Sequence, residues 1–298
     1  MDLICIKRRY KKVRKIVILS FIITLFIYTF LVVNHVQAEK RKEMIFSEDM
    51  MTIKQAINEE QLKKQEEIQK QPKPKILTAD EIYKLNYIYK TEEKRVFLTF
   101  DDGPSKTVTV PILDLLKQEN IKANFFVLGS RVDLYPNIVK RAYEEGHYIG
   151  NHGYSHQYPK IYESSNSVLE EYNKTNQSVR NAIGNSIYNT NIFRFPGGSV
   201  GGMYHDLKSE AKLLLEQNNI ASVDWNALNG DSEGLRTEET MVNRLKETIE
   251  GKNSVVILMH DAGDKVKTYN ALPQIIEYLK QEGYEFKTFY DILENEIK

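Results

Sequence analysis

Two adjacent carboxylates end an apolar, strand-forming stretch of the chain. Residues 97–104 read FLTFDDGP, so Asp101 and Asp102 stand side by side although like charges repel. Asp, Gly and Pro are turn residues, and the pair can simply mark the end of a strand. A bound cation would also offset the repulsion, since carboxylates are common metal ligands. The segment therefore predicts either a plain turn or a metal site.

Two histidines in a second segment are the partners that a metal site needs. Residues 151–156 read NHGYSH, and His152 and His156 are spaced so as to fall on one side of a helical turn. By itself this pair is weak evidence, because solvated histidines occur at the same spacing by chance. Each of the two segments directly follows a predicted strand, and this shared position favours one common site.

Strand-like and helix-like segments alternate from about residue 92 to the C-terminus. Alternating β and α units predict a parallel sheet, and about seven repeats favour a distorted (β/α) barrel over an open sheet. In such barrels the active site forms at the carboxyl ends of the strands. The predicted strands are 95–100, 122–128, 147–150, 191–195, 220–224, 254–260 and 285–289, and predicted helices include 110–118, 138–145, 207–217, 240–250 and 272–281.

Further polar clusters follow the other predicted strands. Arg194 begins RFPGG at 194–198, Asp224 and Trp225 close the next strand, and His260 lies in LMHD at 258–261. Any one of these clusters could be structural. Five of them at one rim form a candidate catalytic set.

The order of these segments resembles the polysaccharide deacetylases of carbohydrate esterase family 4. The resemblance covers about residues 93–298, and it implies metal-dependent removal of N- or O-acetyl groups from a glycan. The matching segments are TFDDGP (99–104), NHGYSH (151–156), RFPGG (194–198), a Trp–Asp segment at 224–231 and LMHD (258–261).

The chemistry of the residues leads to the same reaction. Asp102, His152 and His156 form a two-histidine, one-carboxylate set for a divalent cation, with Zn²⁺ expected and Co²⁺ or Mn²⁺ as alternatives. Such an ion polarises an acetyl carbonyl and lowers the pKa of its water, which would attack the carbonyl. Asp101 would take the proton of that water as general base, and His260 would protonate the departing amine.

The resemblance assigns further roles. By analogy Arg194 would pair with Asp101 and orient it, and the backbone N–H of Gly197 would meet the oxyanion together with the metal. Trp225 and Leu258 are expected to line a small pocket for the acetyl methyl group, although a tryptophan near a barrel rim is also ordinary packing.

The fourth segment departs from the family pattern W-x-x-D-x-x-D-W. Residues 225–232 read WNALNGDS, with Leu228 in place of the middle Asp and Ser232 in place of the final Trp. In the family the last Asp of this pattern supports the catalytic histidine. The resemblance assigns this role toward His260 to Asp231, with Asp224 as the alternative.

The N-terminal part of the chain has the features of a membrane anchor. Residues 16–33 contain 18 residues without a charge, and a helix of this length at ~1.5 Å per residue approaches the ~30 Å hydrocarbon thickness. Seven basic side chains precede it, which predicts a single-pass protein with the catalytic domain outside. The alternative is a signal peptide cleaved after Ala38, which would give a secreted form. The expected organisation is a basic cytoplasmic tail (1–15), an anchor (16–33), a stalk or linker (34–92) and the catalytic domain (93–298).

Composition argues against nucleic-acid binding and thiol chemistry, and the expected location favours one class of substrate. Beyond the basic tail the chain carries a net charge of about −6, so no nucleic-acid partner is expected. The single cysteine, Cys5, rules out a disulfide within the chain and a thiol nucleophile in the main domain. Location in the cell wall favours N-acetylglucosamine of peptidoglycan as substrate, with chitin oligomers, poly-N-acetylglucosamine and acetylxylan as alternatives.

Two other functions remain open at this point. A catalytically silent, glycan-binding barrel would need neither a base nor an acid, so Asp101 and His260 argue against it. A phosphoester hydrolase would need a second metal ion and a more basic pocket than Arg194 alone provides.

Overall fold

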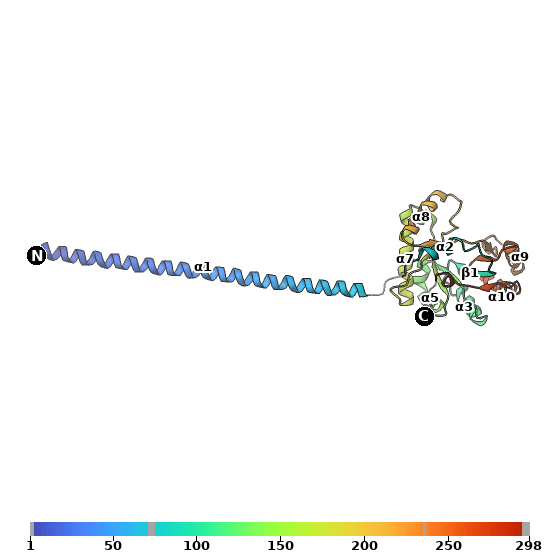
Figure 1. Cartoon of the computed structure of the whole chain (residues 1–298), viewed down its shortest axis with the longest axis horizontal. Helices are drawn as coiled ribbons and strands as arrows, with labels where there is room; N and C mark the ends of the chain where they lie inside the picture. The colour runs from blue at the N-terminus through green and yellow to red at the C-terminus, as the bar shows by residue number, and fades with distance from the viewer. Residues whose placement is uncertain (1–2, 71–74, 235–236, 294–298) are drawn as a thin grey trace. The chain divides into compact units, whose positions relative to one another are not determined.

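The chain divides into two compact units in the computed structural model, which describes residues 3–70, 75–234 and 237–293 (Figure 1). The first unit contains helix α1 (Leu3–Lys70), so the residues expected to form the anchor and stalk are helical as far as Lys70. Among the described residues, α1 carries one stretch that is long and apolar enough to cross a membrane.

The second unit, from Lys73 onward, is built on a parallel sheet. Its strands lie in the order β5-β4-β3-β2-β1-β7-β6, and β8 pairs with the beginning of β1. This half-barrel confirms the prediction of a distorted barrel of about seven parallel strands. The strands are β1 (Arg95–Asp101), β2 (Asn124–Val127), β3 (Tyr148–Asn151), β4 (Ile192–Phe193), β5 (Ala221–Ser222), β6 (Ala227–Leu228), β7 (Ser254–His260) and β8 (Glu285–Phe286).

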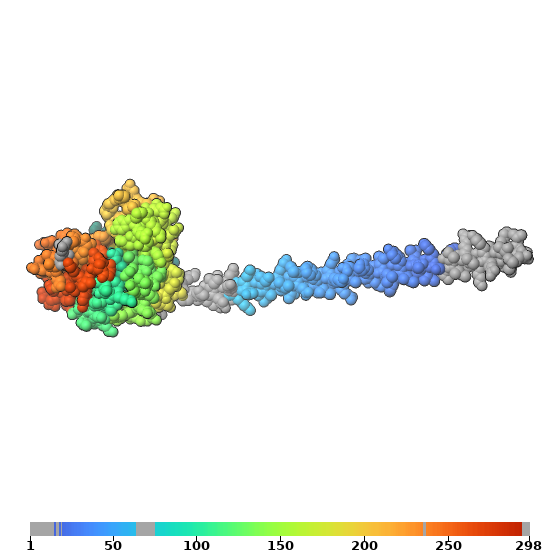
Figure 2. All heavy atoms as spheres, turned by 180° about the vertical axis from the view of Figure 1, so that it is seen from behind, coloured from blue at the N-terminus to red at the C-terminus, as the bar shows by residue number. Residues whose placement is uncertain are grey.

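Helices cover the outer face of the sheet. On the face of the unit shown in Figure 2, the orange-red α10 lies against the green α3, although the two are far apart in sequence. The five helices predicted from apolar periodicity correspond to α3, α5, α8, α9 and α10, each within a few residues at its ends except α10, which begins six residues earlier. The helices of this unit are α2 (Ala79–Asn86), α3 (Thr109–Gln118), α4 (Gly129–Leu134), α5 (Pro136–Glu144), α6 (Tyr158–Ile161), α7 (Ser165–Ile183), α8 (His205–Gln217), α9 (Glu238–Ile249), α10 (Val266–Gln281) and α11 (Tyr290–Leu293).

The side chains of β1 alternate between two buried layers, as they must in a strand covered on both faces. Leu98 and Phe100 belong to the core between the sheet and the outer helices. Phe97 belongs to a second cluster on the inner face of the half-barrel, and Thr99 and Asp101 share this face by alternation. Asp101 therefore ends the strand on the inner face, at the carboxyl rim.

Residues 77–88, which were expected to belong to the stalk or linker, are part of the second unit and pack on its sheet. Leu77, Leu85 and Ile88 are buried in the inner cluster. A capping box fixes the start of α2, since the Thr78 hydroxyl accepts from the Glu81 N–H while the Glu81 carboxylate accepts from the Thr78 N–H. Just beyond this helix, the Ile88 carbonyl accepts from the side chains of Arg95 and Ser254, the first residues of β1 and β7, so α2 lies near the end of these strands opposite to Asp101.

Candidate active site

Three predicted metal ligands lie together at the carboxyl rim. The Nε2 atom of His156 lies 3.3 Å from Oδ1 of Asp102, and that of His152 lies 3.5 Å from the same oxygen. Ligands of a tetrahedral zinc ion, each bonded at about 2.0–2.1 Å, are about 3.3–3.4 Å apart. Oδ1 of Asp102 is buried and has no hydrogen-bond partner among the described residues. The three side chains fit a single divalent cation.

His152 has the protonation state and orientation of a metal ligand. Its Nδ1 lies 2.8 Å from the backbone carbonyl oxygen of Arg194, which can only accept, so Nδ1 carries the hydrogen and Nε2 keeps its lone pair. Burial lowers the pKa of His152 to about 3, although the nearby Asp102 opposes this. The imidazole is therefore neutral at physiological pH.

The loop between the two histidines is not helical, and the prediction that they share a helical turn is wrong. Both follow β3 in irregular backbone, and His156 adopts a left-handed conformation with φ of 55°. The loop is held instead by Glu171 of α7. One oxygen of this carboxylate accepts from the backbone N–H groups of Tyr154 and Ser155, at 2.7 and 2.6 Å. Long-range hydrogen bonds thus bring the two rings together.

Asp101 lies beside the triad and is paired with Arg194. The guanidinium donates to Oδ1 of Asp101 at 2.9 Å and to the Thr99 hydroxyl at 2.6 Å, and Arg194 is fully buried. The other carboxylate oxygen lies 3.8 Å from Nε2 of His152. Burial raises the pKa of Asp101, against the opposing effect of Arg194. One oxygen is thus fixed, while the second lies toward the candidate metal ligand His152.

His260, the last residue of β7, pairs with Asp101 across the β1–β7 register. The ring atom Nδ1 of His260 lies 2.8 Å from Oδ1 of Asp231. The other oxygen of this carboxylate, Oδ2, accepts from the backbone N–H of His260 and from the Thr268 hydroxyl. Burial disfavours the charged imidazole, but the Asp231 hydrogen bond and charge outweigh it and raise the pKa of His260 to about 9. The ring is therefore protonated at neutral pH.

The structure distinguishes the two carboxylates proposed to support His260. Asp231 follows β6, a two-residue strand that the sequence did not predict, and reaches His260. Asp224 instead accepts from the backbone N–H and hydroxyl of Ser199.

Tyr158, which the sequence did not indicate as a site residue, lies between the RFPGG segment and the triad. The Tyr158 ring centroid is 5.5 Å from that of His156. Gly197 has φ of 74°, and a Cβ there would lie 2.7 Å from the Tyr158 hydroxyl. Gly197 is thus required both by its backbone conformation and by the phenol that occupies the space of a side chain.

Trp225 and Leu258 occupy different places near the rim. The Trp225 ring lies against Gly198, where a Cβ would come within 3.0 Å of it. Leu258 is buried on β7, two residues before His260 and on the same face of the strand. Their role toward an acetyl methyl group stays a prediction.

Asp261, although part of the LMHD segment, has a structural role that the sequence did not indicate. Its buried carboxylate accepts from the Thr109 hydroxyl at 2.5 Å and lies against Gly103, where any side chain would collide with it. Its backbone carbonyl accepts from the Ser105 hydroxyl. These contacts hold the turn that follows Asp102, itself in a left-handed conformation with φ of 74°.

Comparisons with known proteins give the same family. Residues 88–214 match the family model described as polysaccharide deacetylase. A peptidoglycan-N-acetylglucosamine deacetylase of Bacillus cereus is 34% identical over 205 residues, which are 67% of this chain and 71% of that protein. The chain belongs to the polysaccharide deacetylases of carbohydrate esterase family 4.

Two solved structures agree with this assignment. A CE4 esterase of Streptococcus mutans matches with a TM-score of 0.62 at 32% identity, covering 72% of this chain and 92% of that one. The catalytic domain of a peptidoglycan N-acetylglucosamine deacetylase from Eubacterium rectale matches with a TM-score of 0.60 at 30% identity, covering 67% and 92%.

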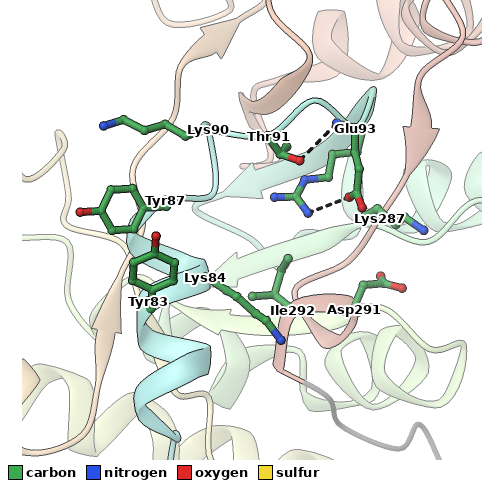
Figure 3. A pocket seen from close by; sticks show the side chains of 10 residues that line it. Tyr83, Lys84, Tyr87, Lys90, Thr91, Glu93, Lys287, Asp291 and Ile292 are labelled. Atoms are coloured by element: carbon green, nitrogen blue, oxygen red, sulfur yellow. Dashed lines mark hydrogen bonds and ion pairs between the residues drawn. The ribbon is translucent and has the colours of Figure 1, made fainter.

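A separate pocket of about 450 Å³ lies beside α2 in this deacetylase (Figure 3). The rings of Tyr83 and Tyr87 lie 4.5 Å apart at its edge, and Arg95 pairs with Glu93. Because Arg95 and Asp101 are the first and last residues of β1, the pocket lies at the opposite end of the strand from the triad. We assign it no part in the reaction.

Proposed function

We propose that the chain removes the N-acetyl group from N-acetylglucosamine of peptidoglycan in a metal-dependent hydrolysis. The observation that carries this proposal is the convergence of three groups of side chains at one rim. These groups are the triad of Asp102, His152 and His156, the Asp101–Arg194 pair and the His260–Asp231 pair.

Asp101 is the general base in this proposal. A divalent cation held by the triad would polarise the acetyl carbonyl and lower the pKa of water. Arg194 fixes Oδ1 of Asp101, so Oδ2 is free to take a proton from the attacking water. Its pKa, raised by burial, brings it closer to the range that suits a base at neutral pH.

His260 is the general acid. Asp231 engages Nδ1, so the proton for the substrate comes from Nε2. The water oxygen bonds to the acetyl carbon as Asp101 takes its proton, and the π electrons of the carbonyl move onto the acetyl oxygen. When the C=O bond re-forms, the C–N bond breaks and the leaving nitrogen takes the proton from Nε2 of His260. The products are acetate and the free amine of glucosamine.

The substrate is inferred from the relatives and from the N-terminal helix. The names of two of the proteins described above specify peptidoglycan N-acetylglucosamine. An apolar N-terminal helix supports a single-pass membrane anchor, with the catalytic domain in the cell wall beside its substrate. A signal peptide cleaved after Ala38 would bring the domain to the same compartment. Zn²⁺ is the proposed ion, because two histidines and one carboxylate suit it.

Acetate release from peptidoglycan fragments tests the proposal. We expect release by the metal-replete protein, loss of release in the presence of a chelator, and recovery when Zn²⁺ is restored. Parallel assays on chitin oligomers, poly-N-acetylglucosamine and acetylxylan compare the alternative substrates. No release from any of them in the presence of Zn²⁺, Co²⁺ or Mn²⁺ would favour a silent, glycan-binding barrel.

A further inference from the structure

Tyr158 places a hydroxyl group beside the site, and the reaction as described above does not use it. The residue begins α6, two positions after the metal ligand His156. Its ring packs between His156 and Tyr162, with centroid distances of 5.5 and 5.7 Å. About a third of the residue, 37%, is exposed to solvent, so a substrate can reach it.

The peptide between Pro196 and Gly197 is held in one orientation. The Tyr162 hydroxyl donates to the Pro196 carbonyl at 2.6 Å. In a trans peptide the N–H points opposite to the carbonyl, so the Gly197 N–H points away from Tyr162. The next N–H, of Gly198, donates to the Phe195 carbonyl at 2.8 Å.

Two hydrogen-bond donors are therefore left next to each other. Neither the Gly197 N–H nor the Tyr158 hydroxyl has a hydrogen-bond partner within the part of the chain that the structure describes. The phenol oxygen lies 2.7 Å from the position that a Cβ of Gly197 would take. A pair of neighbouring donors beside a candidate metal site matches the arrangement that stabilises an oxyanion.

We propose that the Tyr158 hydroxyl donates a hydrogen bond to the acetyl oxygen of the substrate and stabilises the negative charge that develops there. This inference rests on the proposed deacetylase function. Tyr158 keeps its proton throughout and takes part in no bond exchange. Its contribution is a second donor beside the Gly197 N–H.

A structural role makes a different prediction. If the ring served only to support His156, removal of the hydroxyl alone would change nothing, because Phe keeps the ring contact. Loss of the whole ring would then weaken metal binding. Tyr158→Phe separates the two roles, since it deletes the donor and preserves the packing.

The test compares wild type, Tyr158→Phe and the control Tyr83→Phe in the full chain loaded with Zn²⁺, with kcat and KM for acetate release and Zn²⁺ affinity as readouts. Tyr83 is an exposed tyrosine on α2, at the opposite end of the half-barrel. We expect Tyr158→Phe to lower kcat about tenfold or more, since single oxyanion donors contribute at least this much. KM and Zn²⁺ affinity should stay within about twofold of wild type, and the control should behave as wild type.

Three results would overturn the inference. They are a kcat for Tyr158→Phe like that of wild type, a rise in KM alone, and a loss of activity that excess Zn²⁺ restores. Absence of acetate release by the wild-type protein would instead contradict the proposed function itself, so the two failures are distinguishable.

Discussion

Asp231→Asn should shift the pH range in which the enzyme works. Asp231 accepts the hydrogen bond from Nδ1 of His260 and also supplies the charge that favours the imidazolium form. The pKa of His260 is raised from 6.5 to about 9, which corresponds to about 3 kcal/mol of preference for the charged ring. An asparagine removes this charge while burial still disfavours the imidazolium.

The expected loss of activity follows from the fraction of His260 that is protonated. Because the acid must carry its proton, wild-type activity should fall as the pH rises through about 9. If the pKa of His260 in the variant returns to about 6.5, the ratio of wild-type to variant activity should be about 30 at pH 8 and less than about two at pH 6.

The assay is the pH profile of kcat/KM for acetate release, with Asp224→Asn as the matched control. Asp224 also lies near the site but bonds to Ser199 rather than to His260. We expect the control to keep the alkaline limit near pH 9. A loss in Asp231→Asn that is equal at pH 6 and pH 8, or an equal shift in the control, would refute the assignment of the acid and its partner.

Two further predictions concern the triad and its loop. Asp101→Asn should abolish turnover and keep the metal content near normal, whereas His152→Ala should lose both turnover and metal. Equal metal loss in the two variants on elemental analysis would contradict the assignment of Asp101 as base and His152 as ligand. Glu171→Ala leaves two backbone N–H groups of the histidine loop without their acceptor and should weaken Zn²⁺ binding about tenfold or more in chelator competition. Two control variants should bind Zn²⁺ normally: Glu171→Gln, which keeps an acceptor oxygen, and Glu170→Ala at the exposed neighbouring position. A normal affinity in Glu171→Ala would show that the loop does not need the Glu171 carboxylate.

The sequence predicted the rim residues because parallel sheets follow simple rules. β1 is apolar along its length and ends at Asp101, so its position and the placement of the carboxylate at the rim could both be read from the residues. His152, Arg194 and His260 are each at or just after the end of a strand, and the same rule placed them. The amphipathic helices on the outer face were visible through their apolar periodicity.

What the sequence did not show depends on polar contacts between distant segments. α7 was not among the predicted helices, and its buried face includes the polar side chains of Glu171, Thr175 and Asn176, whose burial the local sequence does not indicate. β6 has two residues, too few for a pattern. Tyr158 meets Gly197 only in the folded chain, and nothing in the local sequence indicates that contact.

The shared metal site of Asp102, His152 and His156 can be tested with diffraction data collected at the zinc absorption edge from crystals grown with Zn²⁺. We expect one anomalous peak at about 2.0–2.2 Å from a carboxylate oxygen of Asp102 and from Nε2 of both His152 and His156. A fully occupied zinc peak elsewhere, with these three side chains turned apart, would contradict it.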